Sequence, residues 1–212
     1  KLERERPAFS VSGGRLYYVK ERYLRMYEYR QNRDVPIVSL RRSSSGGTSL
    51  GTAPWGMQYN CMNQSETNLL IWSKAEGGSY ELVTMTRNGA GETEPLRGNG
   101  RGCAFVARNR FAVLDRSRSQ ILIKNMNNEM TKKFDVPVPA PDQIFFAGTV
   151  GRLLITKDDR VFLYENNARR ILADVQAGKV KYVFWNTDRS LVALMSKHGI
   201  TICDKQLQVK CT

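Results

Sequence analysis

The sequence predicts an all-β fold, a β-propeller with about five four-stranded blades. Two observations predict it. The apolar runs span only four to seven residues and are rich in Val, Ile, Leu, Phe and Tyr, as strands are, and no segment shows a convincing helical pattern. These runs also recur in groups of four with a period of about forty residues, which is the length of a propeller blade.

The first two blades are expected at residues 7–40 and 54–86. The runs RLYYVK, YLRMYEYR and VPIVSL lie in the first, and WGMQYN, LLIWSK and YELVTMT lie in the second. Segments 41–53 and 87–102 are rich in Gly, Ser and Pro, so they are predicted to be loops. GNGRG in the second loop lacks the lysine, serine and following helix of a phosphate-binding loop, and no phosphate site is expected there.

The last three blades are expected at residues 103–136, 144–176 and 180–212, where the repeat is clearest. FAVLD, LLITK and LVALM begin at positions 111, 153 and 191, and ILIKN, VFLYE and ITICD begin at 121, 161 and 200. Each blade opens with CAFVAR, IFFAG or VKYVFW and closes with KKFDV, RILADV or LQVKC. The stretch from Asp115 to Gln120 and the segment NMNNE are predicted to be turns between strands.

These are degenerate blades of the WD type, because the tryptophan-aspartate pair that usually ends the third strand is missing. Its place is taken by the pairs YE, KN, YE and CD at 27, 124, 164 and 203. An acidic or amide group therefore stands where the aspartate would be.

Lys and Arg number 33 against 20 Asp and Glu, which leaves a formal charge of +13 and suggests an acidic or polyanionic partner. The basic residues are spread along the whole chain, whereas a nucleic-acid surface usually concentrates them and interleaves aromatic residues. We therefore expect no nucleic-acid partner. An RNA-associated basic propeller is the alternative function that the charge keeps open.

No run approaches the eighteen or so apolar residues of a membrane span, and the first residues, KLERERPAFS, are too charged for a secretory signal. The chain is thus expected to be soluble and cytoplasmic. Its four cysteines, none in a C-x-x-C pair, are predicted to be reduced, buried thiols, although a bridge between neighbouring strands remains open for Cys203 and Cys211. The other two are Cys61 and Cys103.

Convergent catalytic groups are not apparent. The only histidine, His198, precedes a glycine in a predicted turn, and Asp158 with Asp159 is predicted to be a turn, not an acid pair. Asp204 is expected to cap a corner between strands. The tryptophans are predicted to pack between blades from within strands: Trp55, Trp72 and Trp185. We therefore predict no enzyme and no catalytic, cofactor-binding or metal site, and partner-binding residues stay unknown.

Several long segments, in the expected order, resemble the coatomer alpha-subunit family. They are LERERPAF (2–9), YYVKERYLR (17–25), VARNRFAVLDR (106–116), ILIKNMNNEMTKKFDVP (121–137), FFAGTVGRLLI (145–155) and KVKYVFWNTDRSLVALMSKHGITICDKQL (179–207). The resemblance covers most of the chain, and only residues 30–105 match loosely.

In that family the matching region is the second of two amino-terminal propellers, which lies before a helical solenoid. The resemblance implies a non-catalytic scaffold module of the COP-I vesicle coat on the cytoplasmic face of Golgi membranes, in Golgi-to-ER retrograde and intra-Golgi transport. It implies other coatomer subunits as partners, the beta-prime subunit especially. The family's site for dilysine cargo belongs to the first propeller, and no residue of this chain matches it.

The resemblance also implies seven blades, whereas this sequence supplies about five and begins without methionine, as a piece of a longer protein would. Two blade faces would then lack partners. Several hundred Å² of exposed apolar surface would cost on the order of 10 kcal/mol, comparable to the stability of a domain. We expect the chain to self-associate through these faces or to form an incomplete, mobile ring.

Overall fold

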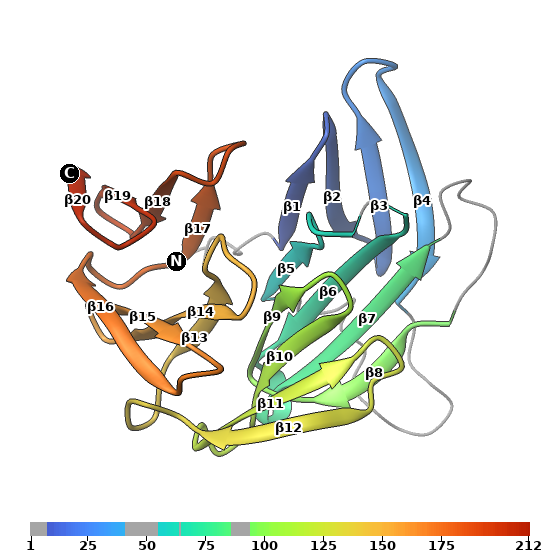
Figure 1. The fold of residues 1–212 in the computed structure, drawn as a ribbon. Helices are drawn as coiled ribbons and strands as arrows, with labels where there is room; N and C mark the ends of the chain where they lie inside the picture. Colours follow the sequence, from blue (N-terminus) through green and yellow to red (C-terminus); the bar gives the residue numbers. More distant parts are fainter. Residues whose placement is uncertain (1–7, 41–54, 64, 86–93) are drawn as a thin grey trace, which may run out of the picture.

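The computed structural model describes residues 8–40, 55–63, 65–85 and 94–212, and it confirms the all-β propeller. Five antiparallel sheets of four strands each surround a common centre (Figure 1). Within every sheet the strands pair in chain order, with the first strand innermost. Each blade is therefore a simple meander, which needs only short connections between consecutive strands.

The strand bounds follow the same scheme in all five blades. Blade 1 contains β1 (Phe9–Ser12), β2 (Arg15–Lys20), β3 (Tyr23–Glu28) and β4 (Arg33–Ser39). Blade 2 contains β5 (Gly56–Tyr59), β6 (Thr67–Ser73), β7 (Ser79–Met85) and β8 (Leu96–Asn99). Blade 3 contains β9 (Gly102–Ala107), β10 (Arg110–Leu114), β11 (Gln120–Asn125) and β12 (Met130–Asp135). Blade 4 contains β13 (Gln143–Phe146), β14 (Arg152–Lys157), β15 (Arg160–Glu165) and β16 (Arg170–Gln176). Blade 5 contains β17 (Tyr182–Trp185), β18 (Leu191–Met195), β19 (Ile200–Asp204) and β20 (Val209–Cys211).

The turn between β10 and β11 shows why polar residues separate the strands. Both Ser119 and Gln120 donate their backbone N–H to Asp115 Oδ1 at 2.8 Å, and Arg118 adopts a φ of 58°. Desolvation would raise the pKa of Asp115, but hydrogen bonds from Ser117, Gln120 and Ser119 outweigh it and leave the pKa below its ordinary value. The carboxylate thus takes the place of backbone partners in a left-handed turn.

Four hydrophobic clusters hold the blades together, and each joins two consecutive blades. One cluster joins blades 1 and 2, one joins blades 2 and 3, one joins blades 3 and 4, and one joins blades 4 and 5. Each cluster contains fully buried residues from both blades, such as Leu24 with Leu69 in one and Phe105 with Tyr80 in another. Burial of strand faces between neighbouring sheets is therefore the main source of stability.

The seam between blade 5 and blade 1 is different. Among the described residues no buried cluster spans it, and the two blades meet through three rings: Phe9 lies 5.7 Å from Tyr182 and 6.1 Å from Phe184, measured between ring centroids. Phe184, Leu191 and Ile200 of blade 5 are 39%, 38% and 48% exposed. Figure 1 shows these two blades, in blue and red, apart from each other at the top of the ring.

Residues 87–102 are not simply a loop, and this corrects the sequence prediction. Strand β8 lies inside that segment, where Leu96 to Asn99 pair with β7. The glycines misled the prediction because one of them is needed for close packing: a Cβ on Gly98 would lie 2.3 Å from the hydroxyl oxygen of Tyr80. The predicted loop at 41–53 lies outside the described residues, and one short 3-10 turn, Ala75–Gly77, interrupts the β structure.

Candidate functional site

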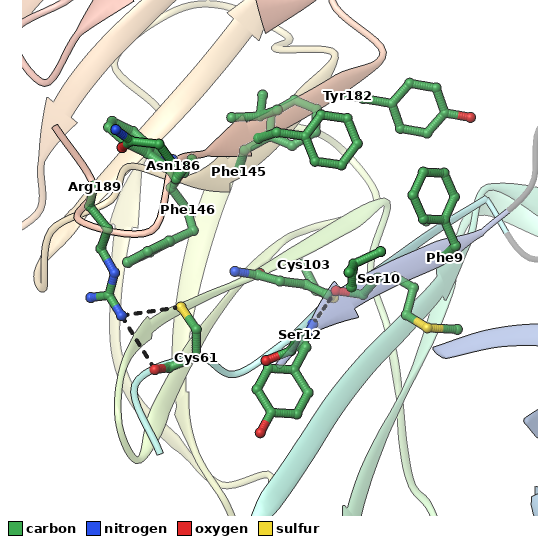
Figure 2. Close-up of a pocket in the computed structure, with 18 of the residues that line it drawn as sticks. Phe9, Ser10, Ser12, Cys61, Cys103, Phe145, Phe146, Tyr182, Asn186 and Arg189 are labelled. Atoms are coloured by element: carbon green, nitrogen blue, oxygen red, sulfur yellow. Dashed lines mark hydrogen bonds between the residues drawn. The ribbon is translucent and has the colours of Figure 1, made fainter. Parts of the chain in front are cut away.

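A pocket lies between the innermost strands of the propeller (Figure 2). Its volume is about 490 Å³, and the innermost strands β1, β5, β9, β13 and β17 all contribute to its lining. Ligand sites usually measure about 300–1,000 Å³. The pocket is thus large enough for a few side chains and too small for a folded domain.

Hydrogen bonds between blades fix the position of the inner strands. The backbone N–H of Tyr59 donates to Ser10 Oγ at 3.0 Å, and that of Phe105 donates to Gln58 Oε1 at 2.8 Å. On the far side, Trp185 Nε1 donates to the carbonyl oxygen of Phe146 at 3.0 Å. These side chains form hydrogen bonds with backbone groups at the inner edges of neighbouring sheets. They therefore link blade 1 to blade 2, blade 2 to blade 3, and blade 4 to blade 5.

Aromatic rings make up much of the wall. Phe9, Phe145, Phe146, Tyr182 and Phe184 all line the pocket. Tyr182 and Phe184, two residues apart on β17, stack with ring centroids 6.1 Å apart and an interplanar angle of 18°. Residues i and i+2 of a strand lie on the same face, which explains why these two rings meet.

A glycine makes room for one more ring beside this wall. Gly56 and Trp72 face each other on β5 and β6, and a Cβ on Gly56 would lie 2.3 Å from Trp72 Cζ2. The indole Nε1 of Trp72 is buried and has no hydrogen-bond partner in the described part of the chain. Donor groups of this kind are rare in native interiors.

Arg189 lies at one end of the pocket, beside Cys61 and Asn186, as Figure 2 shows. Its Nη2 donates to the carbonyl oxygen of Cys61 at 3.3 Å and contacts Cys61 Sγ at 3.5 Å. The guanidinium carbon also lies 5.6 Å from the centroid of the Phe146 ring, a cation–π distance. The side chain is therefore oriented before any ligand arrives.

The charge of the lining is one-sided. Lys181 and Arg189 are present, whereas Asp, Glu and His are absent among the described residues that line the pocket. Cys103 lines it too, but desolvation raises the pKa of this fully buried thiol well above its ordinary value, so it stays neutral. The lining is suited to a ligand that has both an apolar part and an anionic group. Its described residues offer no pair of groups for acid–base catalysis.

The sequence-predicted polar residues do not converge. His198 is exposed in the turn between β18 and β19, as expected. Asp158 lies 3.6 Å from Lys157 Nζ, while Asp159 accepts a hydrogen bond from Gln176, so the two carboxylates have different neighbours. Asp204 Oδ1 accepts the backbone N–H groups of Gln206 and Gln208 at 2.9 and 3.0 Å, which is the predicted corner cap.

The cysteines and tryptophans correct two details. All four thiols are free, but only Cys103 and Cys203 are buried, while Cys61 and Cys211 are exposed. Neighbouring strands do bring Cys203 and Cys211 close, without a bridge. Trp55 precedes β5 instead of lying within a strand, while Trp72 and Trp185 pack against residues of the neighbouring blade.

Among the residues that the structure describes, no group of three or more His, Cys, Asp or Glu side chains is placed to hold a metal ion. No helix in the described ranges is long and apolar enough to cross a membrane.

Sequence reasoning missed the pocket residues because they are far apart in the chain. Phe9 and Tyr182 meet only after five blades have curved round, and Cys61 and Arg189 are separated by 128 positions. The usable signal was the aromatic content of the blade-opening runs, IFFAG and VKYVFW, once those runs were assigned to innermost strands.

Comparison with known proteins identifies the repeat. A family model described as "COPA/B second beta-propeller" matches residues 21–210. Coatomer subunit alpha-3 of Oryza sativa subsp. japonica is 45% identical over all of this chain, and coatomer subunit alpha-1 of Arabidopsis thaliana is 44% identical. Coatomer subunit alpha of Saccharomyces cerevisiae is 27% identical over 99% of the chain.

The chain spans only about a sixth of these relatives, 17% of each. Among solved structures, a chain in the crystal structure of the mitotic checkpoint complex aligns with a TM-score of 0.59 over 92% of this chain and 59% of that chain, at 10% identity. At that identity the likeness concerns the fold alone.

Proposed function

This chain belongs to the COPA/B second β-propeller family, and from that membership we propose that it serves as a non-catalytic scaffold module of a COP-I coat subunit. The module supports coat assembly through protein–protein contacts, in Golgi-to-ER retrograde and intra-Golgi vesicle transport. Its location is the cytoplasmic face of Golgi membranes and COP-I vesicles. Its partners are other coatomer subunits, the beta-prime subunit first among them.

The match of residues 21–210 to the family, together with 44–45% identity to plant coatomer alpha subunits along the full chain, carries this proposal. The geometry is compatible with it. The described residues place five sheets in a ring around a small pocket, and the groups that line it are suited to binding and not to proton transfer.

The perimeter of the propeller is the surface that we propose for acidic partners. Outermost strands in all five blades carry a basic residue: Arg33, Arg97, Lys132 with Lys133, Arg170 and Lys210. Lys132 and Lys133 are both exposed on β12, an edge strand. Arg97, Arg170 and Lys210 form ion pairs with Glu81, Glu165 and Asp204, whereas no ion pair of Lys132 or Lys133 is found among the described residues. Basic residues on an edge oppose strand addition, and the charge of these two lysines is the part of the perimeter that we propose for a negatively charged protein or headgroup.

The test is an affinity pulldown of the tagged chain from cytosolic extract, with and without nuclease, read out by mass spectrometry. Recovery of coatomer subunits that survives nuclease supports the scaffold function. A double variant, Lys132→Glu with Lys133→Glu, is expected to weaken that recovery, and a basic protein of similar size and charge serves as control.

Recovery of ribonucleoproteins alone, abolished by nuclease, would instead favour the RNA-associated alternative, because phosphate contacts dominate such binding. A flotation assay with vesicles then separates the membrane contribution. If binding to the vesicles does not depend on anionic lipid, lipid headgroups are not among the partners of the perimeter.

A further inference from the structure

We propose that Ser119, in the turn between β10 and β11, is a phosphorylation site for a protein kinase that selects arginine on the amino-terminal side of its substrate serine. A phosphate at this position competes for two arginines that join blade 3 to its neighbours. The modification goes beyond the scaffold function, because it acts on contacts between blades and not on the surface for partners.

The sequence around Ser119 is the first observation. Arg116 and Arg118 stand three residues and one residue before it, in the segment DRSRSQ. Two guanidinium groups on one side of a hydroxyl fit a kinase whose substrate groove carries carboxylates. Only Ser119 has arginine at both of these positions among the exposed serines that the structure describes, which are Ser65, Ser117, Ser119 and Ser190.

The turn makes the hydroxyl of Ser119 accessible. The side chain is exposed, and its Oγ lies 2.5 Å from Ser117 Oγ and 3.5 Å from Asp115 Oδ2, both within the same turn. None of residues 115–120 belongs to the four hydrophobic clusters. A segment with so little buried apolar surface opens locally without unfolding of the blade, so a kinase can bind it.

The chemical step is phosphoryl transfer from a nucleoside triphosphate. Ser119 Oγ attacks the γ-phosphorus, the bond from that phosphorus to the oxygen that bridges it to the β-phosphorus breaks, and the nucleoside diphosphate leaves. The hydroxyl proton passes to the aspartate base of the kinase. The product carries a charge of about −1.5 to −2 at pH 7 and three strong acceptor oxygens.

The new phosphate enters a turn that already contains a carboxylate. Asp115 is charged at neutral pH, because its pKa lies below the ordinary value. Its Oδ1 accepts the backbone N–H groups of Ser119 and Gln120 at 2.8 Å each. Because like charges repel, phosphorylation of Ser119 weakens both of these hydrogen bonds.

Arg116 joins the turn to blade 2. Its Nε donates to the carbonyl oxygen of Gly78 at 3.1 Å, and its Nη2 donates to Asn99 Oδ1 at 2.8 Å. Both acceptors are neutral. Guanidinium forms stronger, two-point hydrogen bonds with a phosphate, so the phosphate on Ser119 draws Arg116 away from blade 2.

Arg118 joins the same turn to the chain that leads into blade 4. Its Nη1 lies 3.8 Å from Asp142 Oδ1, in the connection that precedes β13. Asp142 Oδ2 in turn accepts the backbone N–H of Asp158, in the turn between β14 and β15, at 2.8 Å. A phosphate one residue from Arg118 competes with Asp142 for this guanidinium, so the modification reaches blade 4 as well as blade 2.

The test uses the 212-residue chain, ATP and the catalytic subunit of cAMP-dependent protein kinase, which selects arginine before serine. Peptide mapping by mass spectrometry measures phosphate at each serine, which separates Ser119 from the segment RRSSS at 41–45, outside the described residues. We expect Arg116→Gln to slow phosphorylation of Ser119 about tenfold. Arg110→Gln removes the same charge from an exposed position at the other end of β10 and should leave the rate unchanged.

Ser190 is the matched control site within the same chain. It is exposed, follows Arg189 directly, and donates its N–H and hydroxyl to Asp188 Oδ1 at 2.9 and 2.7 Å, so its turn resembles that of Ser119. Thr187 stands where Ser119 has an arginine three residues before it. We expect phosphorylation of Ser119 to be at least ten times faster than that of Ser190.

Three outcomes would overturn the proposal. Equal rates at Ser119 and Ser190 would show that exposure alone decides. Phosphate on Ser117 in place of Ser119 would show that the two arginines do not select the site. A peptide of residues 112–124 that is phosphorylated while Ser119 of the folded chain is not would show that the fold protects this serine.

Hydrogen exchange of the phosphorylated chain tests the competition for the arginines. The amides of Gln120 and Asp158 should exchange at least five times faster after phosphorylation, because their acceptors Asp115 and Asp142 are displaced. The amide of Leu191, which donates to Asn186 Oδ1 in blade 5, should not change. Unchanged exchange at Gln120 and Asp158, or equal acceleration at all three amides, would overturn the competition.

Discussion

Replacing Phe9 and Phe105 by alanine, one at a time, tests whether the seam between blades 5 and 1 is the weakest interface of the ring. Phe105 is fully buried in the cluster of blades 2 and 3 and packs edge-on against Phe111. A buried Phe→Ala change costs about 3–5 kcal/mol of unfolding free energy. Phe9 is half-buried and contacts two rings across the seam, so we expect about 1–2 kcal/mol for Phe9→Ala.

Urea unfolding of the two variants, followed by tryptophan fluorescence, measures the difference. With a slope of about 1–3 kcal/mol per molar urea, Phe105→Ala should lower the midpoint by more than 1 M and Phe9→Ala by clearly less. Hydrogen exchange gives a second view, because amides of β17 to β20 should exchange faster than those of β9 to β12. Equal losses from the two substitutions would refute an open seam.

Three further predictions concern packing, turn electrostatics and association. Gly98→Ala should cost about 1–3 kcal/mol in urea unfolding because its Cβ would meet the Tyr80 hydroxyl, whereas Gly199→Ala, with open space around it, should be nearly neutral. Asp115→Ala should cost about 1–2 kcal/mol at pH 7 through the lost turn hydrogen bonds. The folded-state pKa of Asp115 lies below its ordinary, unfolded-state value, so its contribution to stability is present above that ordinary value and should fade as pH falls through the lower, folded-state value. Thermal melts of both chains over a range of pH would show this trend, and a difference that does not depend on pH would contradict it. Ile200→Lys on the exposed face of blade 5 should reduce the concentration-dependent association seen in sedimentation velocity. If the unmodified chain stays monomeric at every concentration, the expected self-association at the seam is wrong.

The sequence was sufficient for the blades because their pattern is local. ILIKN, VFLYE and ITICD repeat at fixed spacing, and each forms the third strand of its blade. Strand β8 was missed because Gly98 looks like a loop residue, while its real role is to admit the Tyr80 ring, which no local pattern records. The exposure of Cys61 was missed for the same reason, since burial depends on which strands curve together.

The pocket was beyond sequence reasoning because its two ends come from contacts across the ring. No sequence pattern singles out Arg189, which lies in a turn with a left-handed backbone at φ of 59°. Only the fold shows that this turn carries its side chain to Cys61, in the connection that follows β5 of blade 2. Local rules therefore assign turns correctly but do not show which of them faces a shared axis.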